Sequence, residues 1–173
     1  MSSAIHAERL ARVRAALKAQ GLDGFVVPIS DEHMSEYVGA YAQRMAWLTG
    51  FGGSAGTAAV LPAKAAVFID GRYTVQVRDQ VDGALFDYVG VPASSVAEWL
   101  GANVSAGQKV GYDPWLHGID WANATAKALA AKGGVMGITG VRMFVRTSDP
   151  TNVGHMADHI DHVARLVGVD HVG

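Results

Sequence analysis

Three histidines near the end of the chain have the residue type and spacing best suited to metal chemistry. His155, His159 and His162 occupy positions i, i+4 and i+7 of a predicted helix, so they share one side of it. Two histidines one turn apart can bind zinc or nickel, and a third strengthens such a site. The apolar stripe of this helix is centred roughly 100° away around the helix axis. Its members are Val153, Met156, Ile160, Val163 and Val167. We therefore expect a polar, partly solvated row with no resident metal or other cofactor, and adventitious binding of a transition metal as the alternative.

A serine-hydrolase trio can be assembled from Ser54, His33 and Asp70, but the sequence around Ser54 does not support it. Gly53 directly precedes Ser54, so the G-x-S-x-G turn that exposes a nucleophilic serine is missing. The glycine-rich run 50–56 lacks the lysine of a phosphate-binding loop and the spacing of a dinucleotide-binding loop. Its glycines instead indicate turns and close packing ahead of a strand. We predict no catalytic residue in this chain.

The segment Asp70-Gly71-Arg72-Tyr73 indicates a connection from a strand to a helix. Asp70 is expected to cap the helix that follows, because short polar side chains accept hydrogen bonds from the first helical N–H groups. Gly71 is expected to supply the turn, and Arg72 to pair with an acid.

Composition narrows the class of protein. The chain has 173 residues, half of them hydrophobic, and a formal net charge of −2 without a basic run, so nucleic acid is not an expected partner. There is no cysteine, and no apolar segment reaches the roughly 18 residues of a membrane span. Charged residues in the first 20 positions exclude a signal peptide's apolar core. We expect no membrane association and a cytoplasmic, or recombinant, origin.

Alternating helices and strands predict a layered α/β fold, with a mixed or parallel sheet flanked by helices. Helices are expected over 4–20, 42–48, 72–80, 96–100, 118–132 and 150–167, with a helical turn from His33 to Tyr37. Strands are expected over 25–27, 57–61, 65–69, 84–89, 109–112, 135–139 and 169–172. The largest contributors to the core are expected to be Phe25, Trp47, Phe68, Trp99 and Leu129. No Pro/Ser-rich hinge is visible, which favours a single domain over residues 1–173.

Three motifs in the first part of the chain resemble a known family. They are SDEHMSEY at 30–37, WLTGFGGSAGTAAVLP at 47–62 and FIDGRYTVQ at 68–76. Residues 1–132 resemble the N-terminal domain of Xaa-Pro aminopeptidases, in the creatinase and prolidase superfamily. The resemblance implies a ribonuclease-H-like α/β fold with a mixed sheet. It also implies that the two divalent metals of such enzymes sit in a separate C-terminal domain.

The same resemblance implies roles for particular residues. N-terminal domains of this family make oligomer contacts and shape the entrance to the active site. The residues expected at the substrate entrance or at a subunit interface are His33, Tyr37, Arg44, Asp70 and Arg72.

Residues 133–173 resemble a different family. The segments 133–145 and 152–173 are similar to one strand–helix–strand (βαβ) unit of membrane (renal-type) dipeptidases, which are zinc-dependent (β/α)8 barrels. The resemblance implies that the metal ligands of those enzymes lie outside this unit. It predicts a scaffold element attached to the preceding α/β portion.

Two functional hypotheses follow. The first is a non-catalytic scaffold that is not an enzyme. We expect it to be an engineered chimera of two hydrolase fragments, because the resemblance changes family at 133 and the sequence stops after a predicted strand. The alternative is a fragment of a metal-dependent Xaa-Pro aminopeptidase or dipeptidase-type peptidase whose N-terminal domain serves oligomerisation and substrate access. A homodimer is expected through an edge strand at 169–172 or an apolar patch at 143–145.

Overall fold

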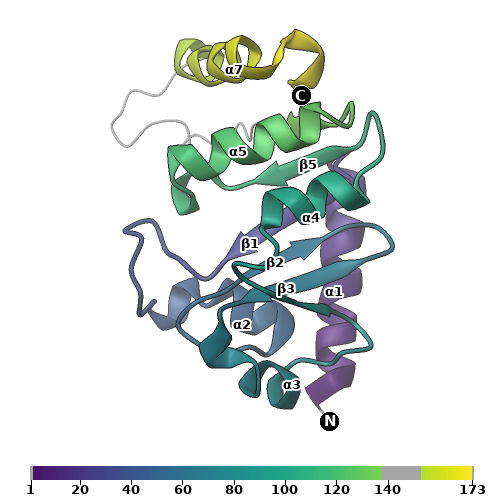
Figure 1. Ribbon diagram of the computed structural model, residues 1–173, viewed down its shortest axis with the longest axis vertical. Coiled ribbons are helices and arrows are strands. Elements are labelled where there is room, and N and C mark those ends of the chain that lie inside the picture. The colour runs from purple at the N-terminus through teal and green to yellow at the C-terminus, as the bar shows by residue number, and fades with distance from the viewer. Residues whose placement is uncertain (1, 138–152, 173) are drawn as a thin grey trace.

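One mixed β-sheet organises the molecule. The computed structural model describes residues 2–137 and 153–172, and within them six strands lie in the order β4-β3-β2-β1-β5-β6. The strands are β1 (Gly24–Pro28), β2 (Thr57–Val60), β3 (Ala65–Ile69), β4 (Asp87–Gly90), β5 (Lys109–Tyr112) and β6 (Val135–Gly137). Strand β2 is antiparallel to both β1 and β3, whereas the β3–β4, β1–β5 and β5–β6 pairs are parallel. Every strand except β2 therefore ends at the same edge of the sheet, on the left in Figure 1.

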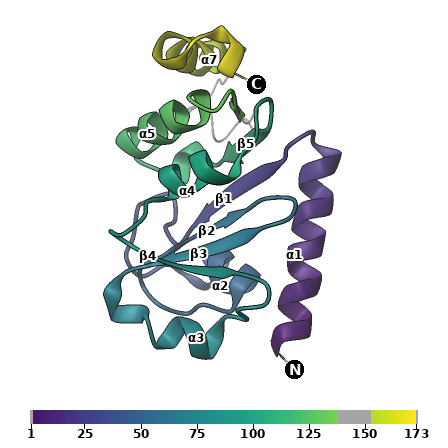
Figure 2. The same ribbon diagram turned by 45° about the vertical axis from the view of Figure 1, so that its right-hand side comes forward.

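Helices cover both faces of this sheet (Figures 1 and 2). Helices α1 (Ser2–Ala19), α2 (Arg44–Thr49) and α3 (Gln76–Gln80) pack on one face. Helices α4 (Val96–Asn103) and α5 (Ile119–Ala130) pack on the other. Helix α7 (Val153–Val167) packs on α5 and β6, where Val163 is buried against Ala126 and Met136. The short helices are η1 (Ala40–Ala42), η2 (Gly71–Tyr73), η3 (Pro114–Leu116) and η4 (Val169–His171).

Local sequence explains the central elements. All five residues of β3 are buried, which is typical of a strand covered on both faces. The tight turn between β2 and β3 closes where the Leu61 N–H donates to the Lys64 carbonyl over 2.8 Å. At the start of α4, Ser95 and Glu98 form a capping box that satisfies N–H groups of the first turn.

The predicted layered α/β fold with a mixed sheet is confirmed, and several element boundaries change. The helix predicted over 72–80 is divided into η2 and α3, and the strand predicted over 84–89 begins only at Asp87. No helical turn forms from His33 to Tyr37, because the Asp31 carboxylate binds N–H groups of this segment instead. Trp47 is 42% exposed, so its expected place in the core is wrong.

The strand predicted over 169–172 is also wrong. Gly168 has φ +97°, and the chain then forms η4, which is held to the sheet where His171 Nδ1 lies 2.8 Å from the Gly134 carbonyl oxygen. A single bridge between Met136 and Val172 is the only ladder contact here among the described residues. The edge strand invoked for homodimerisation is therefore absent at 169–172, and the patch at 143–145 lies outside the described residues. The division at residue 132 and the single-domain reading of 1–173 stay predictions.

Candidate functional site

Four loops meet where the parallel strands end, and we call this side of the molecule the loop edge. Segments 29–43, 70–75 and 113–118 follow strands β1, β3 and β5, and segment 51–56 leads into the antiparallel strand β2. Open α/β sheets commonly bind ligands outside the carboxyl ends of their parallel strands. The five residues predicted at an entrance or interface all belong to these segments or to the first turn of α2.

A buried aspartate shapes the first of these loops. Asp31 is 4% exposed, and its Oδ1 accepts hydrogen bonds of 3.0 Å from the N–H groups of His33 and Ser35. The Ser35 N–H is the main reason that the pKa of Asp31 falls below its ordinary value. Anchored in this way, the loop presents the His33 side chain, which is 75% exposed, and Tyr37, which is 81% exposed. Asp31 was not among the predicted site residues, although an aspartate in the loop shortly after a strand signals this kind of turn.

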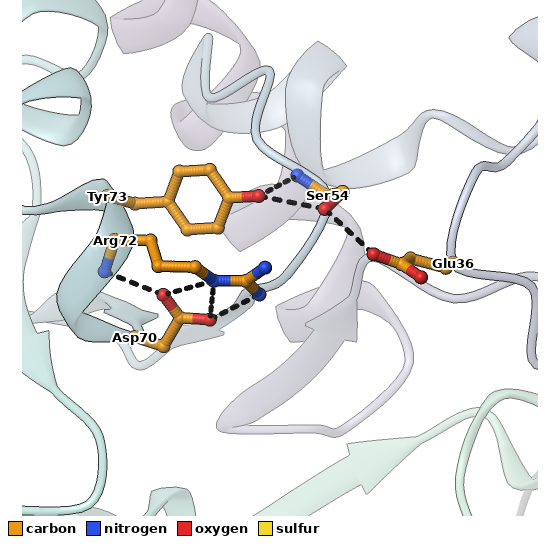
Figure 3. Close-up of polar contacts among 5 residues, drawn as sticks. All are labelled: Glu36, Ser54, Asp70, Arg72 and Tyr73. Carbon is orange, nitrogen blue, oxygen red and sulfur yellow. Dashed lines mark hydrogen bonds and ion pairs between the residues drawn. The ribbon is translucent and has the colours of Figure 1, made fainter.

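A second polar group, the Ser54 cluster, consists of Glu36, Ser54, Asp70, Arg72 and Tyr73 (Figure 3). Ser54 Oγ lies 2.8 Å from the Tyr73 hydroxyl and donates a longer bond of 3.5 Å to Glu36 Oε1. The Ser54 N–H also donates to the Tyr73 hydroxyl over 3.1 Å. Figure 3 shows Tyr73 and Glu36 reaching Ser54 from opposite sides, so this cluster joins the loop after β1 to the one after β3.

The Asp70–Arg72 pair forms the other half of the cluster. Arg72 donates two guanidinium bonds to Asp70 Oδ2, and the ion pair measures 2.7 Å. The Arg72 side-chain and backbone bonds lower the pKa of Asp70, while the Asp70 carboxylate raises the pKa of Arg72. The Arg72 guanidinium also lies 5.3 Å from the centre of the Tyr73 ring. The predicted capping by Asp70 and the pairing of Arg72 with an acid are both confirmed.

Packing accounts for the glycine-rich run and leaves Ser54 without a catalytic base. A Cβ on Gly53 would meet Phe51 Cζ at 2.4 Å and Tyr73 Cε1 at 2.9 Å, so only glycine fits there. The partners of Ser54 are Tyr73 and Glu36, whereas His33 lies beside Glu32 with an Nε2–Oε1 distance of 3.9 Å. The hydrogen bonds from Ser54 also lower the pKa of Tyr73. The serine-hydrolase trio is therefore not assembled.

An open cleft lies at the carboxyl ends of β1 and β5, and we call it the β1–β5 cleft. Its volume is about 500 Å³. Tyr41, Arg44, Trp47 and Asp113 contribute to its walls. Tyr41 is 67% exposed, whereas Asp113 is 9% exposed. Of these four residues the sequence predicted only Arg44, because nothing in the pattern of residues shows that β1 and β5 are neighbours.

The predicted metal candidates can be followed only in part. The side chains of His155 and His159 lie outside the described residues. His162 is exposed, and its Nε2 lies 3.1 Å from Asn123 Oδ1. Among the described side chains, no group of three His, Asp or Glu comes together in a way that suits a metal ion. The divalent metal pair implied by the first resemblance therefore has no fitting ligand set in this part of the chain.

Comparison with known families gives two overlapping matches. The creatinase/prolidase N-terminal domain model matches residues 9–147, and the membrane dipeptidase model, peptidase family M19, matches residues 122–173. Both resemblances inferred from the sequence motifs are confirmed. The two matches share residues 122–147, which include most of α5 and all of β6.

Individual relatives come from the same aminopeptidase group. Xaa-Pro aminopeptidase 2 of Rattus norvegicus is 42% identical over 116 residues, which cover 66% of this chain and 17% of the relative. The crystal structure of X-prolyl aminopeptidase from Caenorhabditis elegans, described as a cytosolic enzyme with a dinuclear active site, matches with a TM-score of 0.67 and 31% identity. That match covers 74% of this chain and 23% of the C. elegans chain. The N-terminal domain of the cytoplasmic peptidase PepQ from Mycobacterium tuberculosis matches with a TM-score of 0.55 and 27% identity, over 75% of this chain and 90% of that domain.

These relatives correct one prediction. The prediction that the chain is not an enzyme is contradicted, because the matched relatives are named as Xaa-Pro aminopeptidases, which are enzymes. The chain aligns with only 17% of the rat protein's length, and its matched part corresponds to the N-terminal domain of that family. No helix in the described part of the chain has the length and apolar character to cross a bilayer.

Proposed function

Because the chain belongs to the creatinase/prolidase N-terminal domain family, we propose that it acts as the N-terminal domain of a metal-dependent Xaa-Pro aminopeptidase, with its loop edge forming part of the substrate entrance. The observation that carries this proposal is the convergence of the loops after β1 and β3 with the first turn of α2 at one edge. Together they hold His33, Tyr37, Arg44, Asp70 and Arg72. A catalytic domain would supply the metal chemistry, and the residues described here supply recognition.

The chemistry of the loop edge suits an incoming peptide. Arg44 and Arg72 are exposed cations that can attract a peptide carboxylate, and Tyr37 offers an exposed aromatic surface. Asp31 holds the loop of Tyr37 in place, while Asp70 holds Arg72. A substrate therefore meets side chains that are already positioned, which lowers the entropy lost on binding.

A domain exchange tests this role. The matching N-terminal segment of the C. elegans enzyme is replaced by this chain's segment, and hydrolysis of an Xaa-Pro peptide is measured for the hybrid and for its Tyr37→Ala and Arg44→Ala variants. Loss of the charge-assisted contact of Arg44 should raise KM about tenfold with little change in kcat, and loss of the Tyr37 ring should raise KM in the same direction. Arg12→Ala, an exposed arginine on α1, is the matched control and should behave like the unaltered hybrid. Equal KM values in all four proteins would contradict an entrance role.

The two family matches support a second proposal, that this is an engineered chain in which residues 1–132 and 133–173 derive from different hydrolases and fold together. Helix α5 and strand β6 lie in the shared stretch 122–147, and α7 packs on both of them. A natural gene that encodes the same order of segments would contradict engineering. Urea unfolding followed by tryptophan fluorescence and by helix circular dichroism should give coincident transitions if the two portions form one unit.

Cytoplasmic localisation and self-association remain part of the proposal. The C. elegans relative is described as cytosolic, which supports the first. For self-association, the apolar segment 143–145 remains the contact predicted from the sequence, and light scattering coupled to size exclusion is the test. A monomer at high concentration would contradict a homodimer.

A further inference from the structure

The β1–β5 cleft has the size and lining of a small-molecule site. Its volume of about 500 Å³ lies within the range of roughly 300–1,000 Å³ that is usual for ligand pockets. It opens at the carboxyl ends of two neighbouring parallel strands, on the face covered by α1 and α2. Most of its floor is apolar and consists of Val13, Phe25, Val27, Pro28, Leu48 and Leu116. Exposed Tyr41 and Trp47 stand beside this floor and can enclose an apolar group.

Two opposite charges contribute to the wall of the cleft without pairing with each other. Arg44 is exposed and has no ion-pair partner within 4.0 Å in the described part of the chain. Asp113 is largely buried, and its Oδ1 accepts a bond of 3.0 Å from the Trp115 N–H. Its other oxygen, Oδ2, has no hydrogen-bond partner among the described residues.

The side chains of Arg44 and Asp113 both line the cleft. Burial raises the pKa of Asp113, while the Trp115 N–H and the positive charge of Arg44 lower it. The negative charge of Glu32 raises the pKa of Asp113 as well, and among the described residues no ion pair within 4.0 Å joins Arg44 to Asp113. A gap of this kind, above an apolar floor, can be bridged by a ligand that carries both charges.

We propose that the β1–β5 cleft binds a small zwitterion with an apolar side chain, namely a free apolar α-amino acid or its dipeptide. The ligand carboxylate contacts the Arg44 guanidinium, the ammonium group contacts Asp113 Oδ2, and the side chain rests on the apolar floor beside Trp47. The proposal goes beyond the entrance role, because it concerns a site complete within this chain.

A matched ligand series separates this idea from simple hydrophobic binding. L-Leucine carries all three groups, whereas 4-methylpentanoate lacks the ammonium, isoamylamine lacks the carboxylate and glycine lacks the side chain. Binding to the whole chain is measured by chemical shift changes in ¹⁵N-labelled protein, including the Trp47 indole N–H. Leucine should bind about tenfold more tightly than 4-methylpentanoate and isoamylamine, since each lost charge-assisted contact costs about a factor of ten. It should also bind at least about tenfold more tightly than glycine, which buries no apolar side chain on the floor. Equal affinity of leucine and isoamylamine, or the absence of saturable leucine binding, would overturn the proposal.

Variants locate the site. Arg44→Gln should weaken leucine about tenfold and leave isoamylamine unchanged, and Asp113→Asn should weaken leucine and leave 4-methylpentanoate unchanged. Asparagine can still accept the Trp115 N–H, so the cap of η3 is kept. Arg12→Gln on α1 is the control and should bind like the parent chain. If Arg44→Gln and Asp113→Asn bind leucine as the parent does, the assigned contacts are wrong. If the chain binds leucine but Arg44→Ala leaves KM unchanged in the domain exchange, only the entrance role is contradicted. If Arg44→Ala raises KM there but the chain does not bind leucine, only the cleft site is contradicted.

Discussion

His117 provides a direct test of how burial controls the pH dependence of stability. Its imidazole stacks on Trp121 with ring centres 3.7 Å apart and an interplanar angle of 14°. Nε2 is buried and has no hydrogen-bond partner among the residues that the structure describes. Burial lowers the pKa of His117 from 6.5 to about 4, so the folded protein holds the ring neutral at pH values where an unfolded chain takes up a proton.

The direction and size of the effect follow from proton linkage. The stability that comes from a neutral His117 is present above pH 6.5 and is lost as the pH falls from 6.5 towards 4, because only the unfolded chain binds the proton there. Between pH 7 and pH 5 the free energy of unfolding should fall by about 2 kcal/mol through this residue. Replacement by phenylalanine keeps an aromatic ring against Trp121 and removes the titrating group.

The assay is urea unfolding at pH 7, 6 and 5, followed by circular dichroism, for the parent chain, His117→Phe and His162→Gln. The parent should lose about 2 kcal/mol more than His117→Phe between pH 7 and pH 5. His162 is exposed and contributes to the same small pocket between α5 and α7, so His162→Gln controls for a nearby histidine and should follow the parent. Identical losses in the parent and His117→Phe would refute the reasoning.

Three further predictions concern local structure. In thermal denaturation, Gly53→Ala should destabilise the fold by about 1–3 kcal/mol through its clash with Phe51. Gly52→Ala is the control and should change the free energy of unfolding far less, because the nearest contact of its new Cβ would be at 3.7 Å. Ser95→Ala should cost about 1 kcal/mol in urea unfolding, because the capping box of α4 is lost, and an unchanged midpoint would contradict that role. Asp31→Ala should speed amide hydrogen exchange at the two N–H groups that its carboxylate binds, and unchanged protection there would show that the carboxylate does not hold the loop.

Local structure could be predicted from the sequence where a residue contacts only its near neighbours along the chain. The cap formed by Asp70 involves a residue two positions away. Helix α7 ends at Val167, as predicted, and the next residue, Gly168, has a backbone that accepts positive φ. The prediction of a strand over 169–172 was wrong because the apolar residues at both ends of this segment resemble those of a short strand. The contact between His171 and the Gly134 carbonyl, which fixes a 3₁₀ turn there, depends on tertiary packing.

The cleft could not be predicted from the sequence for a related reason. Arg44 and Asp113 belong to different elements, and they line one cleft because β1 pairs with β5. Tyr41 and Trp47 carry the apolar residue types of a core, and their exposure follows from the position of α2 at the loop edge. Strand order is the missing information, since neither helical periodicity nor a motif specifies which strands are neighbours.

The loop after β1 connects the Ser54 cluster with the β1–β5 cleft. The loop after β1 carries Glu36 to the Ser54 cluster and leads through Tyr41 to Arg44 at the cleft. Asp31 fixes the start of this loop from a buried position. Ligand binding at Arg44 and contacts of Glu36 with Ser54 therefore act on one anchored segment. Because Arg44 is assigned to both the entrance and the cleft, a peptide at the entrance and an amino acid in the cleft would compete for its guanidinium.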